Sequence, residues 1–363
     1  MAKAILFGVV LVAALCLSAA LGANVVAITG PYQDTIQLND VESLKTVQTI
    51  EGSGTELFQL VSMGKYVYVT SVNSLAEYHG VIRMYEVQSG TNKLEFVRSK
   101  TYGTKCIQPV ALTASYDYTD EPAVVMTCLA TTTVLVVDPE TLELIQLLPE
   151  PSITGIRIKD IGMSAMTARY LYVTYSICPQ SDDEFSKGLV VQYSRNMSEI
   201  LNYSIVRGQT SYLEIAGSSD LFLTSSGNGA SYLLQLNPNT LEEVDRTNPQ
   251  GFDFKQMAMN PNQKSFYMYI QKSGNNMGRI RSYDQTKYPA EKFCSDVRID
   301  MSPATQPIVI NDYVFIRSDL SMTRFTLKNG SGCPLQNSQK LYGLNVARDS
   351  GVAVACLECL PIS

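Results

Sequence analysis

The sequence has 363 residues, of which 45% are hydrophobic and 17% are charged, and its formal net charge is −6. This composition is typical of a globular protein and excludes an intrinsically disordered chain. A mildly acidic chain without a cluster of basic residues also argues against nucleic acid as a partner.

The first 22 residues predict a secretory signal peptide. Lys3 precedes an unbroken apolar run from Ala4 to Leu17, and the small residues Ala20 and Gly22 precede a cleavage site near Ala23. The alternative is a membrane anchor, but the run is short for a membrane span. We therefore expect a soluble, secreted protein without a membrane span, in which residues 23–363 form a single domain.

Seven cysteines remain once Cys16 is removed with the signal peptide, and outside the cell they predict disulfides. They are Cys106, Cys128, Cys178, Cys294, Cys333, Cys356 and Cys359. An odd number leaves one thiol free or able to link two chains into an oligomer. The last two could instead be half of a metal site, but the chain has only one histidine, so a disulfide role is favoured.

One disulfide can be derived from local structure. The segment from Cys106 to Cys128 has the pattern of a strand, a turn and a strand. Folding it as a hairpin around Tyr118 brings the two cysteines together. We therefore predict a bond between Cys106 and Cys128.

A strand pattern returns along the chain. It begins as "GKYVYVTS" at Gly64, and its copies recur on average every 48 or so residues, which is the period of propeller blades. The anchor residues of the seven copies are Tyr66, Ala123, Tyr170, Leu221, Phe266, Tyr313 and Val352. Each copy is rich in β-branched or aromatic residues and apolar on both faces, which predicts a strand covered on both sides.

A second motif, a strand, a polar turn and another strand, follows each of the first six copies. Its seventh copy lies at the front of the chain, from Asp34 to Ile50, and nothing follows the last copy at Val352. The N-terminus is therefore expected to supply the two outer strands of one blade and the C-terminus its two inner strands, which closes the ring. We predict an all-β, seven-bladed propeller with four-stranded blades.

These repeats resemble the YVTN-type and lactonase-like propellers. The resemblance rests on "YVYVTS", "GVIRMYEV" and "VLVVDPETLELI" and spans roughly Asn24 to Pro361. It implies the fold, but the group includes enzymes, binding proteins and surface proteins, so it does not by itself imply a function. Lactonase-like propellers hold a metal in their channel with acidic and amide residues from several blades.

The first strand of each blade is expected to line the central channel, and each candidate strand has one polar residue. The predicted ring is Gln59, Gln108, Asp160, Glu214, Gln256, Gln306 and Asn345. Hydrated channel lining is one interpretation. The other is a Ca²⁺ site held by Asp160 and Glu214, although a ring composed mostly of glutamine is a poor ligand set. No other cofactor is expected.

Two long loops between second and third strands are expected to open on the same face as this ring. One contains His79, the only histidine, and the other contains Asp182, Asp183 and Glu184. Long loops on a rigid scaffold often bind ligands, although both could be solvated insertions. The chain has neither a GxSxG motif nor a phosphate-binding loop, so no catalytic residue is predicted.

Three sequons predict N-glycosylation, at Asn196, Asn202 and Asn329. Asn196 and Asn329 are expected in turns on the face opposite the long loops, whereas Asn202 is expected in or near a fourth strand. Glycans on that opposite face would direct partners to the loop-bearing face.

Three functions remain open. The first is a non-enzymatic extracellular protein that binds a protein or small ligand on the loop-bearing face. The second is a metal-dependent, lactonase-like hydrolase with Asp160 and Glu214 as ligands. The third is a structural component of an extracellular coat or matrix.

Overall fold

The structure is a computed structural model that describes most of the chain. The described residues are 25–29, 35–52, 56–73, 78–88, 91, 93–115, 122–167, 169–179, 187–194, 196–216, 220–227, 230–248, 251–260, 265–272, 278–284, 291–292, 294–299, 307–310, 312–318, 321–328, 333–342 and 353–356.

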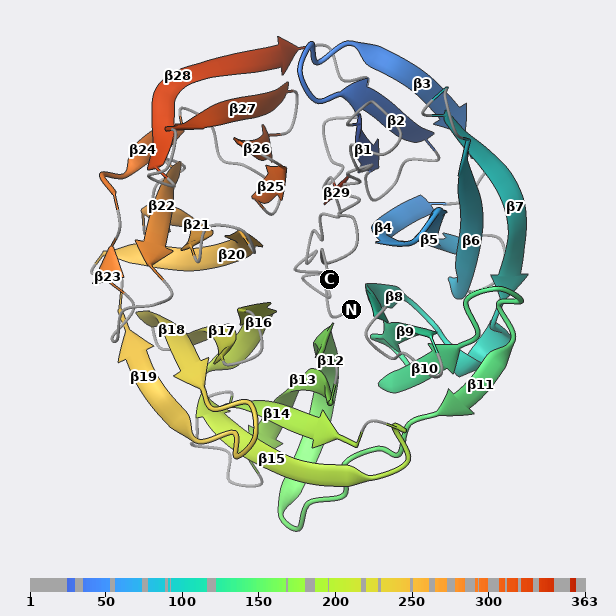
Figure 1. The fold of residues 1–363 in the computed structure, drawn as a ribbon. Coiled ribbons are helices and arrows are strands. Elements are labelled where there is room, and N and C mark those ends of the chain that lie inside the picture. The colour runs from blue at the N-terminus through green and yellow to red at the C-terminus, as the bar shows by residue number, and fades with distance from the viewer. Residues whose placement is uncertain are drawn as a thin grey trace, which may run out of the picture.

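Within these residues the strands form seven antiparallel sheets, which surround a common axis like the blades of a propeller (Figure 1). We name them A to G along the chain and give the strands from the axis outward. Sheet A contains β29 (Ala353–Cys356), β1 (Val25–Thr29), β2 (Thr35–Asp40) and β3 (Thr46–Glu51). Sheet B contains β4 (Glu56–Met63), β5 (Tyr66–Asn73), β6 (His79–Gln88) and β7 (Lys93–Thr101). Sheet C contains β8 (Pro109–Ser115), β9 (Ala123–Cys128), β10 (Thr133–Val137) and β11 (Leu144–Leu147).

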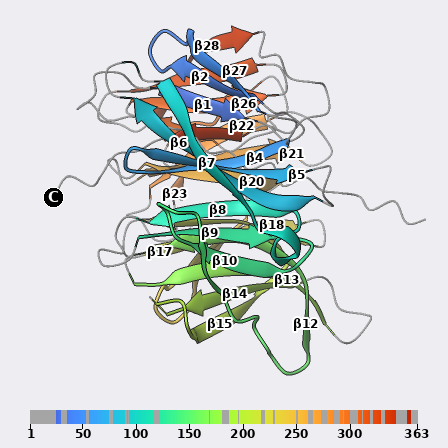
Figure 2. The same cartoon turned by 90° about the vertical axis from the view of Figure 1, so that its right-hand side faces the viewer.

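The remaining sheets follow the same plan, and Figure 2 shows all of them from the side. Sheet D contains β12 (Ile156–Met166), β13 (Leu171–Pro179), β14 (Lys187–Tyr193) and β15 (Ile200–Arg207). Sheet E contains β16 (Gln209–Ala216), β17 (Asp220–Gly227), β18 (Ala230–Leu236) and β19 (Glu243–Thr247). Sheet F contains β20 (Phe252–Asn260), β21 (Ser265–Lys272) and β22 (Gly278–Asp284), with β23 (Glu291–Lys292) and β24 (Val297–Ile299) both paired to β22. Sheet G contains β25 (Ile308–Ile310), β26 (Tyr313–Ser318), β27 (Ser321–Lys328) and β28 (Cys333–Tyr342).

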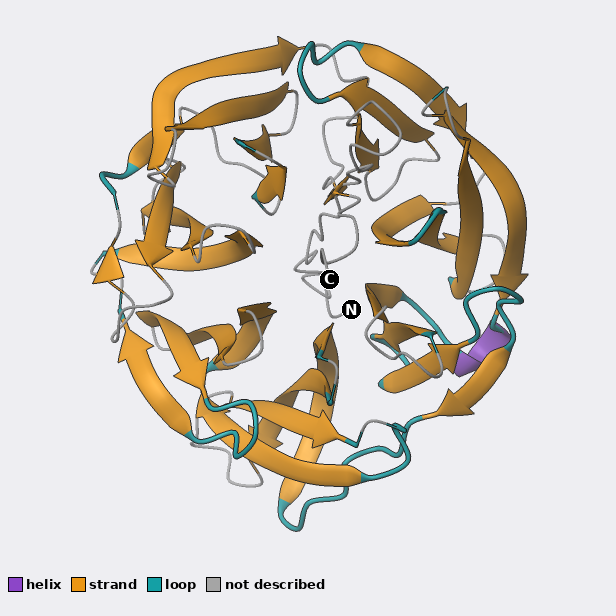
Figure 3. Ribbon diagram, viewed as in Figure 1, coloured by secondary structure: helices purple, strands orange, loops and turns teal. Residues whose placement is uncertain are grey.

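The predicted all-β propeller is confirmed, and the described residues contain only one turn of 3-10 helix, Gly103–Lys105 (Figure 3). No described helix is long and apolar enough to span a membrane. The first six copies of the repeated pattern form the second strands of their sheets. In one of them, β9, every side chain is buried. These strands are apolar on both faces because each sheet packs between two others. For example, the rings of Phe222 in sheet E and Phe266 in sheet F lie 4.8 Å apart.

The closure of the ring differs from the prediction. The C-terminal segment supplies one strand of sheet A, the innermost β29, and the N-terminal segment supplies the other three. β29 pairs with β1 in the register Ala27 opposite Ala355. The prediction assigned two strands of this sheet to each end of the chain. It overlooked β1, a short β-branched run that precedes the motif from Asp34 to Ile50 and is not part of it. Val352, the seventh anchor, lies outside the described residues.

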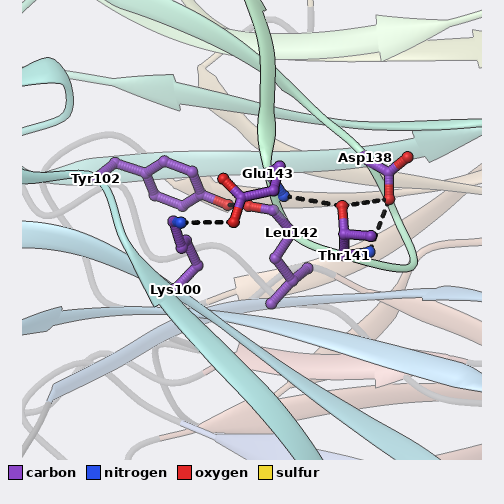
Figure 4. Close-up of polar contacts among 6 residues, drawn as sticks. All are labelled: Lys100, Tyr102, Asp138, Thr141, Leu142 and Glu143. Carbon is purple, nitrogen blue, oxygen red and sulfur yellow. Dashed lines mark hydrogen bonds and ion pairs between the residues drawn. The ribbon is translucent and has the colours of Figure 1, made fainter.

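A recurring turn joins third and fourth strands. In sheet C the carboxylate of Asp138 accepts hydrogen bonds from the backbone N–H and the hydroxyl of Thr141, at 2.7 and 2.8 Å (Figure 4). The next residue, Leu142, has a φ of 61° and is fully buried. A leucine in this region is strained. Burial of its side chain and the capping carboxylate offset the strain. Leu44 and Leu241 are buried in the same backbone conformation in sheets A and E, after turns capped by the carboxylate of Asp40 and the amide oxygen of Asn237.

Two disulfides connect described residues. The predicted bond between Cys106 and Cys128 is confirmed, with Cα atoms 5.2 Å apart. A second bond, which the sequence did not predict, joins Cys294 to Cys333 and so ties sheet F to the first residue of β28 in sheet G. The side chains of Cys178, Cys356 and Cys359 lie outside the described part, so an unpaired thiol that links two chains stays a prediction.

Candidate functional site

The inner strands share a local feature that fixes their heights along the axis. In sheet D the hydroxyl of Thr174 accepts a 2.9 Å hydrogen bond from the backbone N–H of Met163, beside a bulge in β12. In sheet B the hydroxyl of Thr70 accepts a 3.0 Å bond from the backbone N–H of Gln59, again beside a bulge. A bulge places an extra residue opposite a single partner. We call this height the threonine level; Thr127, Thr224 and Tyr269 occupy it in sheets C, E and F.

The register corrects the predicted polar ring, because its described members lie at three heights. Gln59 and Gln256 lie opposite the threonine-level residues of their sheets. Gln108 and Asp160 lie before this level on their inner segments, and Glu214 lies beyond it. Gln306 and Asn345 fall outside the described residues. Bulges shift the pairing by one residue, which the alignment of short sequence segments does not reveal.

Gln59 also differs from a channel-lining residue in its contacts. Its side chain is buried, with 7% of the residue exposed, and its amide oxygen accepts a hydrogen bond from the backbone N–H of Leu112 in sheet C. The amide therefore joins two sheets. Asp160 is different, because 43% of its side chain is exposed and its only ion pair with a described residue is a loose 4.0 Å contact with Lys159.

The two predicted calcium ligands lie at different heights in this register. Asp160 lies opposite Ser176, two residues beyond the threonine level on β13. Glu214 lies opposite Phe222, two residues before that level on β17. The difference of four residues corresponds to roughly 13 Å along the axis. The backbones of the two residues are thus far apart along the axis, and the side chain of Glu214 lies outside the described part, so a shared Ca²⁺ ion stays a prediction. Among the described residues, no group of three or more His, Cys, Asp or Glu side chains could hold a metal.

A different set of residues shares the height of Asp160. Each of them lies opposite the residue two positions beyond the threonine level. The set, which we call the mouth level, is Glu56, Gln108, Asp160, Gln209 and Asp253, from sheets B to F in order. These residues are three acids and two glutamines whose backbone positions share one height on five consecutive sheets, and the side chains of Glu56 and Gln209 lie outside the described part. The mouth level lies toward the end of the axis at which second strands lead to third strands, where the long loops were expected.

Sequence reasoning found Gln108 and Asp160 but missed the other three members. The signal that would have found them is the number of residues between each of them and the "YVTS"-type strand that follows, once the extra residue of the bulge is included. Glu56 lies opposite Val72, Gln209 opposite Ser226 and Asp253 opposite Gln271. A gapped alignment of inner and second strands together would have placed them.

His79 is not a loop residue as predicted. It is the first residue of β6, it pairs with Asn73, and it forms an isolated bridge with Ile107. Its Nε2 atom is buried without a hydrogen-bond partner in the described structure. The next residue, Gly80, donates a 2.7 Å backbone hydrogen bond to Cys106, so His79 lies in a rigid segment beside the disulfide. The other predicted binding residues, Asp182, Asp183 and Glu184, lie outside the described residues.

The two described sequons differ in their surroundings. Asn196 is exposed in the turn between β14 and β15, where its Oδ1 accepts a 2.7 Å hydrogen bond from the hydroxyl of Ser198. Asn202 lies within β15, and its Nδ2 donates a 2.7 Å hydrogen bond to the carbonyl oxygen of Thr240 in sheet E. The nitrogen that would carry a glycan is thus engaged between two sheets at Asn202. Asn329 lies outside the described residues.

Comparisons with known proteins support the propeller fold. No family model matches the chain, and no curated protein matches it. Two similar solved structures are each named "putative 6-phosphogluconolactonase". The one from Bacteroides fragilis has a TM-score of 0.64 and 12% identity over 93% of this chain and 99% of that chain. The one from Bacteroides uniformis has a TM-score of 0.60 and 11% identity over 90% and 99%. A chain of the mitotic checkpoint complex has a TM-score of 0.64 and 12% identity over 88% and 91%. At these identities the likeness shows the fold alone, an all-β propeller.

Proposed function

We propose that the protein is a seven-bladed, lactonase-like hydrolase that opens a small cyclic ester at the mouth level. The observation that supports the proposal is the strand register, in which Glu56, Gln108, Asp160, Gln209 and Asp253 share one backbone height on five consecutive sheets. The overlap with two proteins named as lactonases supports the substrate class. The neighbours do not supply the site residues, which are argued from this chain alone.

Hydrolysis of a lactone needs a base that takes a proton from water and a donor that binds the carbonyl oxygen. We assign the first role to Asp160, whose half-exposed carboxylate is open to water. The amide of Gln108, at the same height in the neighbouring sheet C, is the donor. The oxygen of the water bonds to the carbonyl carbon, and the C–O bond of the ring breaks. The proton held by Asp160 then passes to the leaving alkoxide. Because Asp160 and Glu214 do not share a height, no step is assigned to a metal ion.

The test is hydrolysis of a six-membered sugar lactone by the protein secreted from a eukaryotic host, followed by acid release in a pH-stat. We expect Asp160→Asn to lower kcat roughly 100-fold or more, the usual contribution of a general base. Glu143→Gln is the control, because Glu143 is an exposed residue in an outer turn. Wild-type protein that releases acid no faster than buffer would refute the proposal, as would an Asp160→Asn variant with full activity.

The non-enzymatic binding protein and the extracellular structural component stay predictions. The loops expected to bind a partner lie largely outside the described residues, as do the residues that would test a thiol-linked coat. Secretion and glycosylation are also predictions, with which the two internal disulfides are compatible. A protein that hydrolyses no lactone but is secreted with its disulfides intact would favour the non-enzymatic binding function.

A further inference from the structure

Sheet F has a small pocket that the proposed hydrolysis does not use. Phe252, Lys272, Arg279 and Arg298 line it, and its cavity volume is about 60 Å³. Phe252 begins β20 and Lys272 ends β21, while Arg279 and Arg298 are the second residues of β22 and β24. Four strands therefore contribute one residue each at the same end of the sheet.

The strand register places these side chains on one face of the sheet. Phe252 lies opposite Lys272, and Arg279 lies opposite both Ile270 and Arg298. Residues opposite each other, or two apart on one strand, project to the same face. Asp253 of the mouth level follows Phe252 directly and so belongs to the opposite face. The pocket and the mouth level are consequently separate sites.

Arg279 is held in place by an aromatic ring and a buried acid. Its guanidinium lies 5.1 Å from the centroid of the Phe252 ring, a distance typical of cation–π contacts. The carboxylate of Asp296, with 6% of its side chain exposed, accepts hydrogen bonds of 3.0 and 2.9 Å from the guanidinium of Arg281. Its distance to Arg279 is 3.6 Å, and 43% of the Arg279 side chain remains exposed.

Arg281 and Asp296 form a charged pair beside the pocket. Burial lowers the pKa of the Arg281 guanidinium, but its contacts with Asp296 and Tyr283 together raise that pKa above its ordinary value, so Arg281 stays charged. Lys272, Arg279 and Arg298 bring three cationic side chains to the lining of the pocket. None of the described residues that line the pocket is acidic, and Lys272 is exposed and makes no ion pair with any described residue. The local charge is positive in a chain whose net charge is −6.

We infer that this pocket binds a doubly charged tetrahedral oxyanion, the phosphate or sulfate monoester group of a ligand. A water molecule needs roughly 10–15 Å³ of such space, so the cavity has room for about four waters or one group of this size. Arginine forks match pairs of oxygens on such a group, and three nearby cations favour a double charge over a single carboxylate. Phe252 supplies an apolar floor that keeps Arg279 directed at the ligand.

The experiment is a calorimetric titration of the purified protein with inorganic phosphate, sulfate and acetate at constant ionic strength. We expect phosphate and sulfate to bind one per chain and acetate to bind at least tenfold more weakly. We also expect Lys272→Gln and Arg279→Gln each to weaken phosphate binding roughly tenfold, the value of one charge-assisted hydrogen bond. Lys93→Gln, which removes an exposed lysine in sheet B, should bind phosphate as the wild type does.

Equal affinities for phosphate and acetate would overturn the inference, and so would a Lys272→Gln variant that binds phosphate as tightly as the wild type. Similar affinities for phosphate and sulfate would show recognition by charge and shape, which fits either ester. Circular dichroism of each variant checks that the fold is retained, and Lys272 is exposed enough for its loss to be tolerated. Lactone hydrolysis plays no part in the readout, so this inference can fail while the proposed function stands, and the reverse also holds.

Discussion

The hydroxyl of Tyr172 in sheet D donates a 2.7 Å hydrogen bond to the carbonyl oxygen of Pro238 in sheet E. Tyr68 in sheet B makes the same contact with Pro139 in sheet C, at 2.9 Å. Both tyrosines are fully buried on second strands, and both prolines lie in the recurring turn of the next sheet. A tyrosine and a turn thus form a repeated link between neighbouring sheets.

This repeated link predicts two unequal losses of stability. Pro238 also accepts a 2.8 Å bond from the amide of Gln192, so Tyr172→Phe leaves its carbonyl with a partner. We expect a cost of about 1 kcal/mol there. No second bond to the Pro139 carbonyl is found among the described residues, so Tyr68→Phe should cost about 2 kcal/mol. Urea unfolding of both variants measures the difference, and a larger loss for Tyr172→Phe would contradict this account.

Buried tyrosines predict a loss of stability in alkaline solution. Burial raises the pKa of Tyr193 to about 12, from 10.0. Its hydroxyl donates to Pro149 at 3.0 Å and lies 2.9 Å from that of Tyr175. The unfolded chain releases this proton near pH 10 and the folded chain only near pH 12. The stabilisation is therefore complete below pH 10 and is lost as the pH rises to 12, by roughly 2.7 kcal/mol for this group. Unfolding at pH 9 and pH 11.5 measures it, and Tyr193→Phe should show a smaller drop.

The two described sequons predict unequal glycosylation. Asn196 is exposed in a turn, whereas the side-chain nitrogen of Asn202 is bonded to Thr240. In a secreting eukaryotic host we expect a glycan at Asn196 and none, or only a trace, at Asn202. Mass spectrometry of the glycopeptides gives both occupancies. A fully occupied Asn202 would mean that the sequon is modified before sheets D and E pack together.

The close approach of Gly80 to the disulfide predicts that a larger residue at this position destabilises the protein. A Cβ atom at this position would lie 2.6 Å from Sγ of Cys106, which is bonded and cannot move aside easily. We expect Gly80→Ala to cost about 1–3 kcal/mol, the usual cost of overpacking. In a Cys106→Ser and Cys128→Ser background the cost should fall, since the smaller oxygen is free to rotate. A double-mutant cycle measured by urea unfolding gives the coupling, and additive effects would rule out the contact.

The sequence predicted what depends on neighbouring residues and failed where the contact is distant. The strand from Tyr66 was predictable because aromatic and β-branched residues occupy both of its faces. The bond from Cys106 to Cys128 was predictable because both cysteines belong to one hairpin. Cys294 and Cys333 lie on different sheets, 39 residues apart, and no local pattern joins them.

The candidate site was harder to predict than the fold, because it depends on height along the axis. A strand signal survives a shift of one residue, but a ring of side chains does not. Asp160 and Glu214 lie on the inner strands of neighbouring sheets. A sequence alignment that ignored bulges therefore assigned both residues to the same height along the axis. Counting from Thr174 restores the heights, and Asp160 then joins Asp253.

The pairing of β29 with β1 has a consequence for the inner edge of sheet A. Until Ala353–Cys356 are in place, β1 is the unpaired inner edge of a three-stranded sheet A. Two segments far apart in the sequence thus complete one sheet, and the four residues of β29 cover an edge of β1 that could otherwise pair with another chain.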